Sequence, residues 1–271
     1  MNKFLERFWG YAEVINPVKY SFTWRHLIIF FSVMAFVVFF SMYYCRKSEK
    51  RQKIFMIISC VILIALEVVR MIWNQNKLKG LGRSLTFWNI ANLDLFHVTL
   101  WVGVIFMLLA IAFGHKKAIC QFMLNFMFSV TAVVAIIDII YPVFLDQSHY
   151  FMYNFANLEF VISRSVVILL AMFIGASDWL ANSIDDMWMA IVSLIVVFAV
   201  GTGVYYLSNQ VVDIIYITGC PWIEMVGIHI ASPWHLCVVA LFFFAFQILM
   251  YLPFDIYRKV HGIDIVDYRK K

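Results

Sequence analysis

The segment LFHVTLWVGVIFMLLAIAF, residues 95–113, decides the fold class, because it contains no lysine, arginine, aspartate or glutamate. A helix of roughly 20 apolar residues crosses a bilayer core about 30 Å thick. The segment therefore predicts a transmembrane helix. Asp94 comes directly before it and His97 lies in its first turn. These two polar side chains at the start of an apolar span are the first candidates for a functional site.

The rest of the chain has the same character. Of 271 residues, 64% are hydrophobic and 14% are charged, and the mean hydropathy is +0.86. Soluble domains are about 45–50% apolar and about 25% charged. The composition predicts a polytopic integral membrane protein with no soluble domain of useful size.

Apolar runs of spanning length recur along the whole sequence and predict an all-α transmembrane bundle of about seven spans. A membrane β-barrel would show strictly alternating segments of about 10 residues, and these runs do not alternate. The predicted spans are Leu27–Cys45, Ile54–Trp73, Leu95–Phe113, Ala118–Phe144, Leu158–Ser177, Met187–Leu207 and Trp234–Phe254. For the fourth span two outcomes stay open, an early end or a kink at Pro142.

The domain organisation follows from these spans. Residues 26–254 form the predicted seven-helix transmembrane domain, and residues 255–271 form a basic C-terminal tail. Residues 1–25 are polar and aromatic and lack the compact apolar core of a signal peptide, so we expect an interfacial N-terminal segment.

Lysines and arginines predict the orientation, because cytoplasmic connections carry an excess of them. With seven spans, one side receives 46–53, Lys116, Lys117 and the tail, twelve basic residues against seven on the other side. We therefore expect a multi-pass protein of the cell membrane with a cytoplasmic C-terminus. The net charge of +5 indicates topology and contact with lipid headgroups. A nucleic-acid partner would need a basic face on a soluble domain. The sequence predicts no such domain, so we expect no nucleic-acid partner.

Charges within the spans are the candidate functional residues, since such groups tend to face the bundle interior and pair. Glu67 and Arg70 are three residues apart and share one helix face. Asp94 and His97 have the same spacing. The candidate polar site comprises Glu67, Arg70, Asp94, His97, Asp138, Arg164 and Asp213.

Two interpretations of this set stay open. Guanidinium groups match phosphate and carboxylate headgroups, so the arginines are candidates for binding a lipid headgroup. Alternatively, the acidic members neutralise the arginines in a structural charge network. Glu159 and Arg164, five residues apart, do not face each other well, so we expect their partners elsewhere. The five cysteines show no CxxC spacing, and the sequence predicts neither a metal site nor a cofactor.

In their order, several short stretches resemble the YwaF-like integral membrane proteins, whose eukaryotic relatives include a membrane acyltransferase acting on ether lysophospholipids. The likeness extends from about residue 22 to residue 254. The stretches are FTWRHL (22–27), EVVRMIW (67–73), LFHVT (95–99), VDIIYITGCP (212–221), SPW (232–234) and YLPF (251–254).

The resemblance implies a cysteine nucleophile on the third span and a histidine on the fifth. This chain departs from the pattern at both positions: with His97 on the family's histidine, Thr99 takes the cysteine position, and Arg164 takes that of the fifth-span histidine. A threonine hydroxyl without an adjacent base is a poor nucleophile, and an arginine stays protonated.

Three hypotheses remain. The first is a non-catalytic protein of this fold that binds membrane lipids, or is a scaffold or a subunit beside other membrane proteins. The second is a lipid acyltransferase or hydrolase with an altered site, in which Thr99 and His97 are the candidate catalytic residues. The third is a transporter of small solutes or ions, although the chain lacks an inverted repeat.

Overall fold

The computed structural model describes residues 8–10, 23–91, 93–142, 154–180, 184–208, 213–217, 224 and 234–261. This part of the chain contains helices and no β-strand. Most of the expected interfacial segment and residues 262–271 of the expected tail lie outside it. So do Ser232 and Pro233 and most of the connection between the sixth and seventh spans.

Among the described residues, seven helical stretches are long and apolar enough to cross a membrane, which confirms the predicted all-α bundle. The spans are α2 (Trp24–Cys45), α3 (Glu49–Gly80), α5 (Leu95–Phe113), the continuous α6, η2 and α7 (Ala118–Phe126, Met127–Thr131 and Ala132–Ile140), α8 (Phe155–Ala176), α9 (Met187–Leu207) and α11 (Trp234–His261). Short helices α4 (Phe87–Ala91) and η4 (Ile184–Asp186) lie between them.

Helix ends differ from the predicted bounds where polar residues continue a helix. Helix α3 is longer than its predicted span 54–73, because the charged residues after Ser48 and before Leu81 remain helical. The fourth span ends at Ile140 and not at 144, two residues before Pro142, which has no N–H to donate. Helix α11 passes through Pro253 and includes the first residues of the expected tail.

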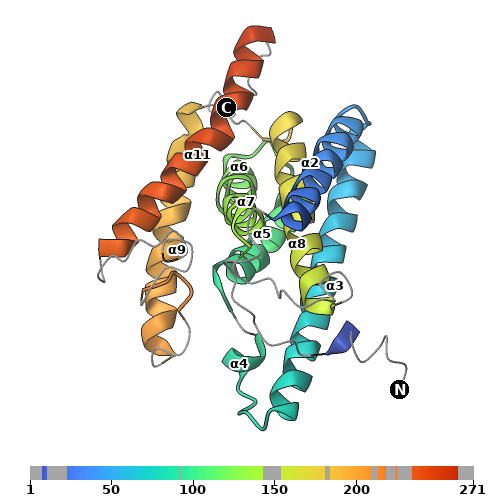
Figure 1. Cartoon of the computed structure of the whole chain (residues 1–271). Coiled ribbons are helices and arrows are strands. Elements are labelled where there is room, and N and C mark those ends of the chain that lie inside the picture. Colours follow the sequence, from blue (N-terminus) through green and yellow to red (C-terminus); the bar gives the residue numbers. More distant parts are fainter. Residues whose placement is uncertain are drawn as a thin grey trace.

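The spans run alternately up and down, and α8 and α7 lie at the centre (Figure 1). Helix α2 packs mainly on α8, and α8 also contacts α7 and α3. Helices α9 and α11 lie together at one side of the bundle (Figure 1). Because α8 is covered on several sides, polar residues on it must find partners inside the protein.

A π-helical turn, η2, interrupts the fourth span. Ser129 Oγ there donates to the Asn125 carbonyl at 2.8 Å. Helix α5 passes close to the turn at Gly103, where an added Cβ would lie 2.8 Å from Thr131 Oγ1. Thr131 Oγ1 also donates to the Thr99 carbonyl at 3.0 Å. The turn therefore fixes α5 against the fourth span, and π-helical turns are frequent at functional sites.

Candidate functional site: a buried charged cluster and a basic groove

Glu67 and Arg70 form an ion pair on one face of α3, as their spacing predicts. Arg70 Nη2 lies 2.8 Å from Glu67 Oε2, and Arg70 Nε also donates to the carboxylate. The guanidinium reaches α4 as well, where Nη2 donates to the Ala91 carbonyl at 2.9 Å. Both side chains are buried. The pair thus attaches α3 to the segment that leads into α5.

Asp94 positions His97 at the start of α5. Its Oδ1 atom accepts from the His97 backbone N–H at 2.8 Å and lies 2.6 Å from Nδ1 of the ring. The carboxylate is therefore both the helix N-cap and the acceptor that places the ring proton on Nδ1. Burial alone would raise the pKa of Asp94, but the interactions with His97 and Arg164 outweigh it and hold the pKa well below its ordinary value.

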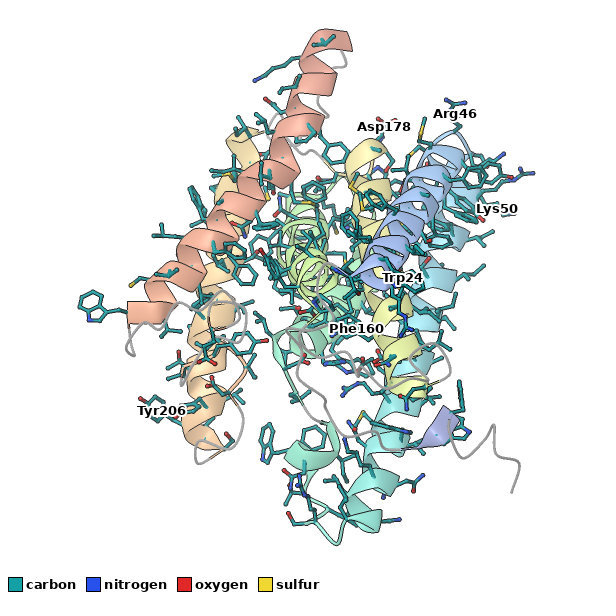
Figure 2. The ribbon with its side chains drawn as sticks, in the orientation of Figure 1. Trp24, Arg46, Lys50, Phe160, Asp178 and Tyr206 are labelled. Carbon is teal, nitrogen blue, oxygen red and sulfur yellow. The ribbon has the colours of Figure 1, made fainter. Side chains whose placement is uncertain are left out.

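Arg164 lies at the centre of the bundle and is 1% exposed. Its Nε and Nη2 atoms both lie 3.1 Å from Asp138 Oδ2 on α7. The guanidinium carbon lies 3.7 Å from the ring centroid of Phe96 and 4.0 Å from that of Phe160. Cation–π contacts of this kind compensate in part for the lost hydration of a buried guanidinium. Figure 2 labels Phe160, which marks this position on α8.

Glu159 connects the two ion pairs. Its Oε1 atom lies 4.0 Å from Arg164 Nη1, and one of its carboxylate oxygens lies within 4.8 Å of ligand atoms of both Glu67 and His97. His97 Nε2 is 3.4 Å from Glu67 Oε1. We use the name charged cluster for Glu67, Arg70, Asp94, His97, Asp138, Glu159 and Arg164. Six of these residues come from the predicted set, and Glu159 joins them.

The other two predicted residues have different surroundings. Thr99 is fully buried, and its hydroxyl is within hydrogen-bond distance of two carbonyls of its own helix, those of Leu95 at 2.8 Å and Phe96 at 3.0 Å. Asp213 lies in the short described segment 213–217, where Oδ1 accepts from the Ile217 N–H at 2.6 Å. Ile215 of that segment packs against Gly201 of α9.

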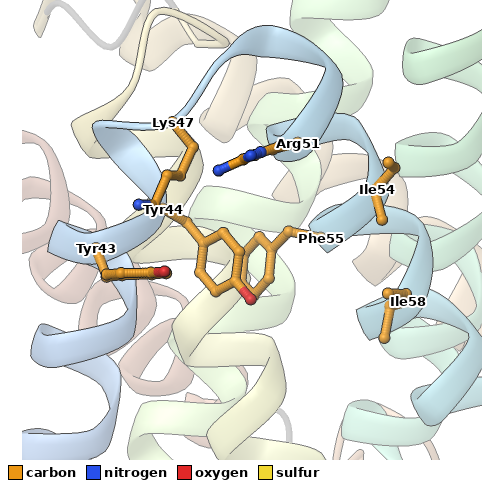
Figure 3. A pocket seen from close by; sticks show the side chains of 7 residues that line it. All are labelled: Tyr43, Tyr44, Lys47, Arg51, Ile54, Phe55 and Ile58. Atoms are coloured by element: carbon orange, nitrogen blue, oxygen red, sulfur yellow. The ribbon is translucent and has the colours of Figure 1, made fainter.

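A groove lies between the end of α2 and the start of α3, about 24 Å along α3 from Glu67 at 1.5 Å rise per residue. It encloses about 290 Å³. Figure 3 shows Lys47 and Arg51 above the rings of Tyr44 and Phe55. We call it the basic groove, and its lining residues are Tyr43, Tyr44, Lys47, Arg51, Ile54, Phe55 and Ile58.

The basic groove is polar at one end and apolar at the other. Tyr44 and Phe55 stack with centroids 4.0 Å apart, and Lys47 Nζ lies 4.0 Å above the Tyr43 ring. Ile54 and Ile58 continue down α3 and are exposed. In the part of the chain that the structure describes, no ion pair joins Lys47 or Arg51 to a carboxylate. Figure 2 labels the exposed Arg46 and Lys50 at the same end of the bundle.

Sequence reasoning missed Glu159 and the basic groove as sites. Glu159 lies near a span end, where carboxylates commonly reach water, and only the packing of α8 against α3 and α5 turns it inward. Aromatic residues beside charges, Phe96 before His97 and Phe160 after Glu159, are a signal in the sequence that could have linked these positions. The basic residues of the groove were recognised as a topology feature without their aromatic neighbours.

Comparisons with protein-family models, curated proteins and solved structures give no match for this chain. The fold and the site therefore define the class directly. It is a multi-pass helical membrane protein of seven candidate spans, with a buried charged cluster at the ends of its central helices.

Proposed function

We propose that this protein is a non-catalytic integral membrane protein that binds an anionic phospholipid in the basic groove. The observation that carries the proposal is the combination of two cations without a carboxylate partner among the described residues and an adjoining aromatic and aliphatic wall. A phospholipid has the matching order of groups, a phosphate above acyl chains. Basic pockets between transmembrane helices are a recurrent way to bind anionic headgroups.

The position of the groove supports an occupant from the cytoplasmic leaflet. Lys47 and Arg51 belong to the connection whose five basic residues favour the cytoplasmic side. Anionic lipids are enriched in that leaflet. A Lys ammonium acts as a point charge, whereas an Arg guanidinium donates in a planar fork, so the two together contact one phosphate from different directions.

The absence of catalysis is part of the proposal. The family resemblance, which we retain as a proposal, puts Thr99 and Arg164 at the positions of the nucleophile and its histidine. The Thr99 hydroxyl is directed at carbonyls of its own helix, and Arg164 is held by Asp138. His97 and Thr99 are also two positions apart on one helix, and residues so spaced do not face each other.

The experiment compares lipid binding by two variants of equal charge. Wild-type protein in nanodiscs of neutral phosphatidylcholine is titrated with phosphatidylglycerol and followed by native mass spectrometry. The double variant Lys47→Ser/Arg51→Ser should bind roughly 10- to 30-fold more weakly, because each lost cation near the headgroup is worth about 1 kcal/mol.

The matched control is Arg46→Ser/Lys50→Ser, which removes the same charge from the same connection but from exposed side chains outside the groove. It should bind within about twofold of wild type, since diffuse surface charge is screened over about 8–10 Å. If both double variants bind phosphatidylglycerol equally weakly, the loss comes from general surface attraction. That result would reject the groove as the lipid-binding site.

A further inference from the structure

Besides Arg70 Nη1 and Asp138 Oδ1, two buried polar atoms of the charged cluster lack a hydrogen-bond partner, His97 Nε2 and Glu159 Oε1. Both residues are at least nine-tenths buried, with exposures of 5% and 4%. Buried polar atoms are normally hydrogen-bonded, and an exception in a native fold requires an explanation, such as an ion. Both atoms belong to residues whose ligand atoms converge with those of Glu67 within 4.8 Å.

The tautomer of His97 favours a metal ligand. Asp94 Oδ1 accepts the proton on Nδ1, so a metal-binding ring, which must be neutral, would present the lone pair of Nε2. Nε2 faces Glu67 Oε1 at 3.4 Å. Metal-binding histidines commonly donate the second ring N–H to a carboxylate in this way. The distance of 3.4 Å also equals the separation of about 3.4 Å between two ligand atoms that are each about 2.1 Å from one tetrahedral ion.

The charge of the cluster favours the same conclusion. Four carboxylates, those of Glu67, Asp94, Asp138 and Glu159, face two guanidiniums, those of Arg70 and Arg164. The formal charges of these four carboxylates and two guanidiniums sum to −2. Uncompensated charge is strongly unfavourable at low dielectric, and one divalent cation brings the sum to zero.

We infer that Glu67, His97 and Glu159 form a binding site for one divalent first-row transition-metal ion, with Asp94 as the residue that orients His97. One imidazole and two carboxylates suit Zn²⁺ and Mn²⁺. Glu67 keeps its ion pair with Arg70, since each carboxylate oxygen has two lone pairs. The site joins α3, α5 and α8, and it does not depend on the lipid proposed for the basic groove.

The test uses the full chain, purified in detergent without a histidine tag and treated with a chelator. Zn²⁺ alone, and Mn²⁺ alone, are titrated by calorimetry, and bound metal is counted by elemental analysis after desalting. Wild type should bind one equivalent and show a higher apparent Tm with metal. His97→Gln and Glu159→Gln should each bind at least tenfold more weakly, because a directly bound ligand is lost.

Asp94→Asn keeps a helix-capping side chain and tests the orienting role, with an expected loss of affinity of about 10- to 100-fold. His115→Gln is the matched histidine control, because His115 lies in the connection between α5 and α6, and it should bind as wild type does. Retained helicity and a single size-exclusion peak identify the folded variants. For wild type alone, Co²⁺ substitution should give visible absorption bands of a nitrogen- and oxygen-ligated ion.

Two results would overturn the inference. One is wild-type protein that takes up no metal at micromolar concentration and shows no shift in Tm; the cluster would then be neutralised by protons. The other is metal binding that is equally strong in His97→Gln, Glu159→Gln and His115→Gln, which would place the ion elsewhere.

Discussion

The two ends of the bundle hold their polar residues in opposite ways. Where α5 and α8 begin, the charged cluster lies inside the protein, and carboxylates neutralise its arginines. Where α2 ends and α3 begins, the charges lie at the surface, and neutral amides make the interior contacts. Gln52 Oε1 accepts from Trp179 Nε1 at 2.8 Å, and Gln121 Nε2 donates to the Trp179 carbonyl at 2.9 Å. At this end amides thus fasten segments distant in sequence, whereas in the charged cluster the ion pair of Arg164 with Asp138 joins α8 to α7.

The largest effect is expected for Arg164→Met. Removing one partner of a buried ion pair leaves the other charge uncompensated and costs about 3–5 kcal/mol. The measurement is the apparent Tm in detergent, taken for Arg164→Met alone and for Arg164→Met combined with Asp138→Leu. The double variant should recover much of the loss, since an apolar pair needs no charge compensation. No recovery would mean that Arg164 acts through a contact other than Asp138.

An intermediate effect is expected at the opposite end for Gln121→Leu. The substitution leaves the buried carbonyl of Trp179 without its Gln121 donor, and an unsatisfied buried group costs about 1–3 kcal/mol. The apparent Tm of Gln121→Leu, compared with that of Arg164→Met, ranks the two ends by how much their contacts stabilise the protein. A larger loss of apparent Tm for Gln121→Leu than for Arg164→Met would reverse the comparison. It would show that the neutral amides stabilise the bundle more than the buried ion pair does.

A smaller, pH-dependent effect is expected from Asp94. Its pKa is lower in the folded protein than its ordinary value of about 3.9. Its pairing therefore contributes stability that is fully present above about pH 4 and is lost as the pH falls toward the lower folded value. The apparent Tm of wild type should decline in this acid range, and Asp94→Asn should flatten the decline. An identical decline of the apparent Tm with acid in wild type and Asp94→Asn would contradict the assignment of this decline to the lowered pKa of Asp94.

The smallest effect is expected for Lys53→Ala, which breaks the exposed pair with Glu49 at 2.9 Å. Exposed ion pairs in high dielectric are screened and contribute little. The apparent Tm should be unchanged within the error of the measurement, at low salt and at high salt. A clear loss at low salt would show that surface charge also stabilises this end.

Much of the architecture could be predicted, because a bilayer requires runs of roughly 20 apolar residues that are visible one at a time. The bounds of α5 and α9 were predicted to the residue. The π-helical turn at Met127–Thr131 was not predicted, since the apolar pattern of the span does not distinguish a π-helical turn from an α-helical one. The helical spacing of Glu67 with Arg70 and of Asp94 with His97 predicted which residues share a face.

The sequence by itself determined the membrane class, the order of the spans and the local pairs, because hydrophobicity and helical periodicity depend only on neighbours along the chain. Only the tertiary structure decided that Arg164 meets Asp138 and that Glu159 turns toward Glu67 and His97. Those contacts join helices distant in sequence, and their geometry depends on how α3, α5, α7 and α8 pack. The same packing leaves His97 Nε2 and Glu159 Oε1 without hydrogen bonds, and from that arrangement the metal site is inferred.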